Sequence, residues 1–354
     1  MRCLGQVFAA VMLLTASVAA HADDAPSLKF LLTTTSIEPG HATISSLQQS
    51  PGFWKQQGLN VQTFGVEGSS LAVQQVASGN ADFASVGPEI LLAAREHKLP
   101  LVAFYAIVPH TIFRLMVPVA TKIETAADLK GATIGIPATA SASYPFSRAI
   151  VQAAGLNPDK DVSWLTVGAG AQAALALQRG QIQAMAGWDT MQASFENRGM
   201  AFRDITEPFV PELIGQVLVT REDMLAKHPD IAIKLARGIA EATMYALAYP
   251  EATLKNHWRL YPQSKPRQGS EEEMVKAGIA ELNSRVAVMQ VADWPRTPYG
   301  FIDPASFATT AEMTYRDGQV TDRSILPGAY TNALNAEINH FDRAAVLDQK
   351  IAAP

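Results

Sequence analysis

Residues 68–86 read GSSLAVQQVASGNADFASV, and this stretch shows the unit from which the chain is built. A glycine and two serines precede a short helical pattern, Gly79 ends that pattern, and an apolar run typical of a buried strand follows. Residues 168–186, GAGAQAALALQRGQIQAMA, follow the same plan, with Gly180 as the helix stop. Because the identity between the two stretches is low, we expect two lobes built alike and not a sequence repeat.

Apolar runs alternate with helical patterns on both sides of these stretches, which predicts an α/β protein with largely parallel sheets. The ligand of such a two-lobed protein is expected in the cleft between the lobes, where the strands end. The expected strands are Leu28–Thr33, Val61–Phe64, Ala81–Val86, Leu101–Val108, Phe113–Val117, Thr133–Pro137, Val162–Val167 and Ile182–Ala186. The expected helices are Ser45–Gln57, Ser70–Ser78, Ser143–Ala154, Ala171–Arg179, Pro229–Tyr249, Glu251–Tyr261, Glu271–Met289, Pro304–Asp317 and Tyr330–His340.

The first 22 residues have the pattern of a cleavable export signal. Arg2 supplies a positive end, residues 7–18 are almost entirely apolar, and Ala20-His21-Ala22 is a small-x-small cleavage site. The apolar stretch is shorter than the roughly 18 residues that span a membrane. We therefore expect residues 1–22 to be a signal peptide cleaved after Ala22, and the mature protein to be exported, to a bacterial periplasm or to another exported setting.

The composition excludes several classes of function. The 354 residues carry a net charge of −5 without a run of Lys or Arg, so no nucleic-acid partner is expected. The single cysteine is Cys3, inside the expected signal, so the mature chain has no disulfide and no cysteine-based zinc site.

Catalytic motifs receive no support from the sequence. The histidines of the mature chain lack ligand spacing, and neither H-E-x-x-H, G-x-S-x-G nor a phosphate-binding loop of the Walker type occurs. We expect no enzyme, no metal and no cofactor. One alternative stays open: residues 168–173, GAGAQA, follow an expected strand in the manner of a dinucleotide-binding turn, so a periplasmic enzyme could use them for a cofactor.

Small hydroxyl residues gather where expected strands run into helices. Each could cap its helix, yet capping does not explain the doubled hydroxyls at these turns. Trp188 and Asp189 also follow a strand directly, where they could bind a ligand or simply pack and cap, and Glu89 stands in a similar place. The candidate ligand-binding residues are Thr35, Ser36, Ser69, Ser70, Glu89, Ser141, Ser143, Tyr144, Trp188 and Asp189.

A series of motifs resembles the periplasmic substrate-binding proteins of nitrate, sulfonate, bicarbonate and taurine ABC importers, which are similar to thiamine-pyrimidine-precursor-binding proteins. Residues 52–59, GFWKQQGL, carry the first motif. The series continues in order through residues 68–70, 79–83, 86–89, 128–135, 154–158 and 180–188.

This resemblance implies a type II periplasmic-binding-protein fold with two βαβ lobes, a two-strand hinge and a helical C-terminal region. Lobe 2 would be residues 117–215, inserted into a lobe 1 of residues 23–116 and 216–354. It also implies a monomer that delivers one small molecule to an ABC permease and its ATPase, and it places the ligand contacts at the candidate residues above.

The turns also suggest the kind of ligand. None of them carries the arginine that usually binds a strong oxyanion, whereas Glu89 and Asp189 could pair with an amine or ring N–H. We therefore expect a small organic ligand with a donor group, such as a sulfonate zwitterion like taurine or a heteroaromatic amine, in preference to nitrate. A sensor module that binds the same ligand is a further alternative.

Overall fold

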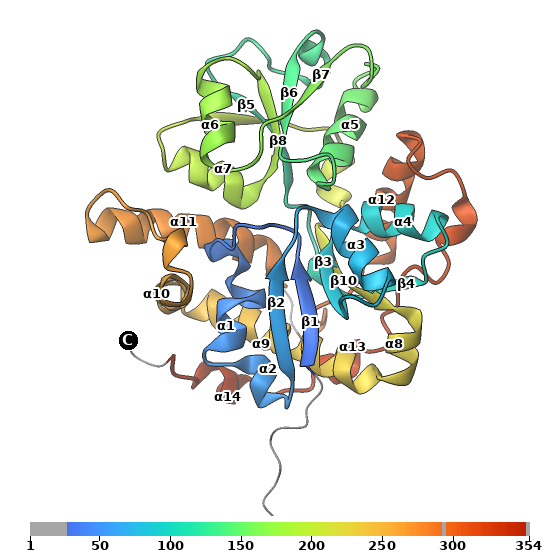
Figure 1. The fold of residues 1–354 in the computed structure, drawn as a ribbon, viewed down its shortest axis with the longest axis vertical. Coiled ribbons are helices and arrows are strands. Elements are labelled where there is room, and N and C mark those ends of the chain that lie inside the picture. Colours follow the sequence, from blue (N-terminus) through green and yellow to red (C-terminus); the bar gives the residue numbers. More distant parts are fainter. Residues whose placement is uncertain (1–26, 292–294, 352–354) are drawn as a thin grey trace, which may run out of the picture.

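The computed structural model describes residues 27–291 and 295–351, which form two α/β lobes stacked along the long axis of the molecule (Figure 1). The expected export signal and its cleavage site lie outside the described residues.

The sheet of lobe 1 has the strand order β2-β1-β3-β10-β4. β1 pairs in parallel with β2 and β3, while β10 runs antiparallel to both of its neighbours, β3 and β4. The bounds are β1 Ser27–Leu32, β2 Asn60–Gly65, β3 Phe83–Val86, β4 Leu101–Val108 and β10 Gln216–Arg221.

The sheet of lobe 2 repeats this plan with the order β7-β6-β8-β5-β9. β6 pairs in parallel with β7 and β8, and β5 runs antiparallel to β8 and β9. The bounds are β5 Phe113–Pro118, β6 Thr133–Ile136, β7 Ser163–Thr166, β8 Ala184–Trp188 and β9 Phe202–Ile205. In each sheet the reversed strand is the one that has just entered from the other lobe, so the strands are largely parallel, as the alternating pattern predicts.

The chain crosses between the lobes twice, after β4 and again before β10. The two crossovers touch at Gly215, whose N–H donates to the carbonyl of Val108 at 3.0 Å. A Cβ at residue 215 would lie only 2.3 Å from the carbonyl oxygen of His110, so glycine permits this close approach. β5 belongs wholly to the second sheet, so we propose that lobe 2 begins at residue 113, slightly before the expected boundary at 117.

Helices cover the sheets of both lobes. The longer ones follow the expected ranges closely, whereas the expected helix Ser45–Gln57 is wrong, because Pro51 and the left-handed Gly52 (φ 89°) split it into α1 and α2. The helices before β10 are α1 Ser46–Gln49, α2 Phe53–Gln56, α3 Ser69–Ala77, α4 Pro88–Glu96, α5 Ser143–Ala153, α6 Ala171–Gln178 and α7 Asp189–Glu196, and a 3-10 helix, η1, spans Pro39–Ile44.

The C-terminal helices pack on lobe 1 and extend it toward lobe 2 (Figure 1). Only α13 forms inside the expected helix Tyr330–His340, because residues 330–331 pair instead beside β4. In the described part of the chain, no helix has both the length and the apolar character needed to cross a membrane. The bounds are α8 Glu222–Lys227, α9 Pro229–Ala248, α10 Pro250–Leu260, α11 Glu271–Met289, α12 Pro304–Arg316, α13 Asn335–Ile338 and α14 Arg343–Leu347.

Candidate ligand-binding site

A small inner cavity of about 30 Å³ lies where the two lobes meet. Such a volume holds about one group the size of a water molecule while the lobes are in contact. Loops at the ends of β1, β2, β6 and β8 reach it, as expected for the carboxyl ends of parallel strands. Its lining is Thr33, Thr34, His41, Gly68, Ser69, Ile112, Phe113, Ser141, Ala142, Trp188, Gln216 and Arg285.

The serine hydroxyls at this cavity are held by bonds to the backbone and to each other. The Oγ of Ser69 accepts from the N–H of Gly87 at 3.3 Å, which leaves its O–H free to donate. Ser143 donates to the carbonyl of Ala186 at 3.3 Å, and its Oγ lies 3.0 Å from that of Ser141. The hydroxyls therefore join loops to each other, and none of the α3 and α5 serines caps its own helix.

Arg285, on α11, brings a guanidinium to the cavity wall from far along the chain. It binds Asp189 through two parallel bonds, Nη2 to Oδ1 at 2.7 Å and Nε to Oδ2 at 2.9 Å. Both side chains are about 3% exposed. Asp189 is therefore a neutralised partner of Arg285, and it is not available to pair with a ligand amine.

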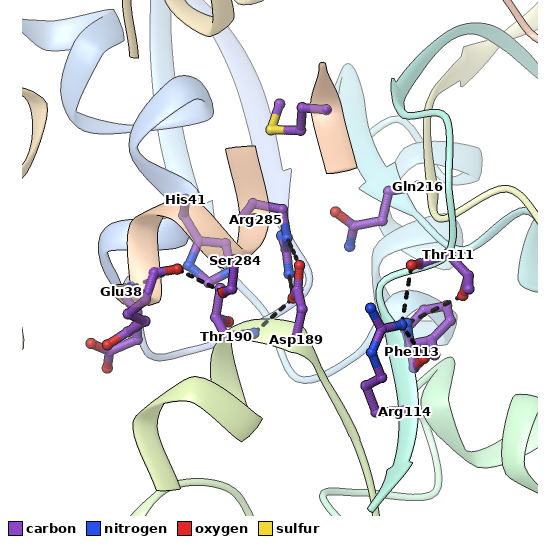
Figure 2. A network of polar contacts seen from close by, with 12 residues as sticks. Glu38, His41, Thr111, Phe113, Arg114, Asp189, Thr190, Gln216, Ser284 and Arg285 are labelled. Carbon is purple, nitrogen blue, oxygen red and sulfur yellow. Dashed lines mark hydrogen bonds and ion pairs between the residues drawn. The ribbon is translucent and has the colours of Figure 1, made fainter. Parts of the chain in front are cut away.

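Three donors remain directed to no protein atom in the described part of the chain: Nη1 of Arg285, Nε2 of Gln216 and Nε2 of His41. Burial, with Arg285 nearby, lowers the pKa of His41 to about 3, so its imidazole is neutral. Since Nδ1 of His41 accepts from the N–H of Glu38, the proton resides on Nε2. Figure 2 shows Arg285 between His41 and Gln216. The inner cavity thus offers mainly donors, which suit an acceptor-rich group.

A larger outer chamber of about 1070 Å³ adjoins the inner cavity and shares Thr34, His41 and Trp188 with it. It lies between η1, α7 and the α10–α11 segment. Trp188, Trp258, Met191 and Met274 supply apolar surface to it. A ligand whose polar end fills the inner cavity therefore has room for its remainder here.

Three carboxylates, those of Glu38, Glu273 and Glu281, line this outer chamber, and so do three basic side chains, those of Arg198, Lys265 and Arg267. The hydroxyl of Ser36 donates to Glu38. Burial raises the pKa of Glu281 to about 8, and the nearby carboxylate of Glu38 adds to this effect, while Arg198 opposes it. A cation placed beside Glu38 and Glu281 would favour the ionised form of Glu281, so these two acids can pair with an ammonium or another N–H donor.

The structure brings some of the candidate residues together and separates others. Ser69, Ser141 and Trp188 line the inner cavity, and Thr35, Ser36 and Trp188 line the outer chamber. Ser70 and Tyr144 instead line a separate groove between α3, α4 and α5. Ser143 is fully buried behind Ser141. Ala169 and Gly170, from the turn that resembles a dinucleotide site, also line the outer chamber.

Glu89 lines neither the inner cavity nor the outer chamber. The residue is 2% exposed, its Oε1 has no hydrogen-bond partner among residues 27–291 and 295–351, and burial raises its pKa to about 8. A Cβ at residue 87 would lie 2.4 Å from this oxygen and 2.8 Å from the Cβ of Ala142 in lobe 2. Glu89 therefore lies beside a contact between the lobes, as an uncharged acid.

Sequence reasoning missed Arg285, His41 and Gln216. A usable signal exists for Arg285, because it stands between Leu282, Val286 and Met289 on the buried stripe of its helix, where an unpaired arginine is rare. His41 and Gln216 give no such signal. His41 lies in the 3-10 helix η1, and Gln216 begins β10, directly after the second crossover.

Two α/β lobes, two crossovers and a polar cavity between the lobes define the class of proteins with the periplasmic-binding-protein fold. The profile of the NMT1/THI5-like family matches residues 39–253, and the chain belongs to this family. No curated protein sequence matches it.

Solved structures confirm the fold. The alkanesulfonate-binding protein SsuA from Xanthomonas axonopodis pv. citri, bound to MOPS, has a TM-score of 0.64 at 16% identity, over 87% of this chain and 99% of that one. SsuA from Escherichia coli has a TM-score of 0.62 at 16% identity, over 87% and 91%. The nitrate-binding protein NrtA from Synechocystis PCC 6803 has a TM-score of 0.62 at 13% identity, over 88% and 87%.

Proposed function

We propose that this protein is an exported solute-binding protein that captures a small organic zwitterion between its lobes and delivers it to an ABC importer. The observation that carries the proposal is the pairing of a donor-lined inner cavity with an outer chamber that holds Glu38 and Glu281. An acceptor group such as a sulfonate or carboxylate would lie against Arg285, and an ammonium would lie in the outer chamber.

Support for the transport role comes from the fold and from the relatives that share it. The structural neighbours include periplasmic sulfonate-binding and nitrate-binding proteins. A two-lobed protein closes around its ligand, and a membrane permease can then recognise the closed shape. Periplasmic location, a monomeric state and a permease with its ATPase as partners belong to the same proposal.

The choice of a zwitterion revises the electrostatic argument drawn from the sequence. That argument counted Glu89 and Asp189 as ligand carboxylates and found no arginine in the turns. In the structure Asp189 is paired, Glu89 lies elsewhere and Arg285 supplies the cation. The amine-binding acids are now Glu38 and Glu281, so a ligand with both an acceptor and a donor end remains the best fit.

Calorimetry on the purified mature protein tests the proposal with four probes: taurine, ethanesulfonate, ethylamine and nitrate. Taurine should bind most tightly, since it alone carries both groups. A ligand at about a hundred times its Kd should also stabilise the fold by about 2.7 kcal/mol, which a thermal shift detects. Nitrate binding more tightly than taurine would refute the ligand class. Recovery of chemically altered ligand would instead support an enzyme.

A further inference from the structure

Arg285 and Asp189 join the two lobes on one side of the cleft. Arg285 lies on α11, which packs on η1, α9 and α10 of lobe 1, and Asp189 begins α7, which packs on β5 and β8 of lobe 2. Their two bonds, at 2.7 and 2.9 Å, form between side chains that are both about 3% exposed. Bidentate geometry of this kind is specific in direction as well as in distance.

A second arginine–aspartate pair joins the lobes on the other side, with the roles exchanged. Here lobe 2 supplies Arg148, on α5, and lobe 1 supplies Asp317, which ends α12. The Nε of Arg148 lies 3.3 Å from each oxygen of Asp317, whose side chain is 2% exposed. Each lobe therefore contributes one arginine and one buried aspartate to the junction, and the Arg148 side chain, 15% exposed, is less buried than that of Arg285.

Each pair is accompanied by one amide-to-carbonyl hydrogen bond on the same two helices. Asn197 Nδ2 donates to the carbonyl of Ala277 at 3.0 Å beside the first pair, and Gln152 Nε2 donates to the carbonyl of Arg316 at 2.7 Å beside the second. In Figure 1, α7 and α11 meet on one side of the junction, and α5 and α12 meet on the other. The contacts thus flank the cleft.

We propose that these two reciprocal pairs, Arg285–Asp189 and Arg148–Asp317, form an interlobe lock that permits the lobes to close in a single register. Parting the lobes returns all four charges to water, so an intact pair adds little net attraction. A mismatched closure, however, would bury an unpaired charge, which is strongly unfavourable. The lock therefore acts by excluding every closed arrangement except the matched one.

Arg285 also connects the lock to the ligand, because its guanidinium is part of the inner cavity wall. A group bound at Nη1 contacts an arginine whose orientation Asp189 sets from the opposite lobe. This link rests on the proposed function, whereas the lock itself concerns only contacts within the chain.

The distance between the two lobes, measured without any ligand, tests the lock. In a Cys3→Ser background the chain has no other cysteine, so spin labels can be attached at Lys55→Cys in lobe 1 and Lys160→Cys in lobe 2, two exposed positions. Asp189→Asn should raise the ratio of open to closed molecules about tenfold or more, because closure would then bury the Arg285 charge unpaired. Adding Arg285→Met should bring the ratio back toward wild type, since no buried charge remains.

Arg148→Met tests the second pair, because closure would then bury the Asp317 carboxylate without its arginine, and it decides the matter if Asp189→Asn fails to fold. Asp159→Asn is the matched control: Asp159 also binds Arg148, at 2.6 Å, but it lies in the same lobe and is 68% exposed. The control should leave the ratio unchanged. Unaltered distances in the folded Asp189 and Arg148 variants, or equal opening in the control, would overturn the lock. A chain that opens as expected yet binds none of the four probes would refute only the proposed function.

Discussion

The indole N–H of Trp54 donates a hydrogen bond of 2.9 Å to the backbone carbonyl of Leu235, a residue 181 positions away. Trp54 belongs to the stretch GFWKQQGL that first suggested the family, and Leu235 lies on α9. Gly238, one turn further along α9, makes room for the ring, because a Cβ there would lie 2.6 Å from Trp54 Cδ1. The motif therefore fastens the N-terminal part of lobe 1 to its C-terminal helices and takes no part in the ligand site.

Trp54→Phe should lower the free energy of unfolding by about 1–3 kcal/mol, because the buried carbonyl of Leu235 loses its hydrogen bond from the indole. Trp54→Ala should cost about 3–5 kcal/mol through the cavity that it leaves. Chemical denaturation measures both. Trp164→Phe serves as the control, since the Trp164 indole also donates to a carbonyl, that of Pro158 at 2.7 Å, but from a partly exposed site. An equal loss in the control would contradict the role of burial.

Ser69 and Ser70 are neighbours at the start of α3 that face different spaces. Ser69→Ala should weaken taurine binding about 5- to 30-fold, the effect of removing one hydrogen bond from a buried site. Ser70→Ala should leave the Kd of taurine unchanged, because Ser70 lines the separate groove. Calorimetry on both variants compares them directly. A larger effect from Ser70 would show that the inner cavity is not the ligand site.

Glu89 should make the stability of the protein depend on pH. Its pKa is raised from 4.5 to about 8 by burial, so the folded protein holds a proton there that the unfolded chain loses. The bound proton stabilises the folded protein fully below pH 4.5. As the pH rises to about 8, the free energy of unfolding falls by roughly 1–4 kcal/mol. Glu89→Gln should therefore show a flatter fall in Tm between pH 5 and pH 9 than wild type. Parallel Tm curves would contradict the buried, uncharged state.

Glu281 should link ligand binding to pH in the opposite direction. Its pKa of about 8 means that it is mostly protonated at neutral pH, and an ammonium beside it would favour release of that proton. The affinity for taurine should then rise from pH 6 to pH 8.5, while the affinity for ethanesulfonate should show no such rise. Glu281→Gln should abolish the difference. Identical pH profiles for the two probes would place the amine elsewhere.

Local patterns were a good guide to the elements of the two lobes, since fully buried strands such as residues 101–108 read as unbroken apolar runs. The strands β9 and β10 were not predicted. β9 is short and half-buried, and β10 pairs antiparallel between β3 and β4, which come from much earlier in the chain. Pairing with distant strands decides such segments, and local sequence does not record it.

The site was harder to predict than the fold, because its residues come from segments that are distant in sequence. The turns at Ser69, Ser141 and Trp188 could be found, since they follow strands whose ends converge at one edge. Whether Asp189 would bind a ligand or pack against the protein could not be decided, because its partner stands 96 residues later on another lobe.

The sequence by itself determined the two-lobed α/β plan, through the period of its apolar residues and the glycines that end its helices. Only the tertiary structure decided the electrostatics of the cleft. A carboxylate that faces water can bind a ligand, whereas one that is paired with an arginine of the other lobe forms a contact between the lobes. Asp189 is of the second kind, because Arg285 on α11 lies beside it. Charge pairing depends on positions in space, which the order of residues along one strand or helix does not specify.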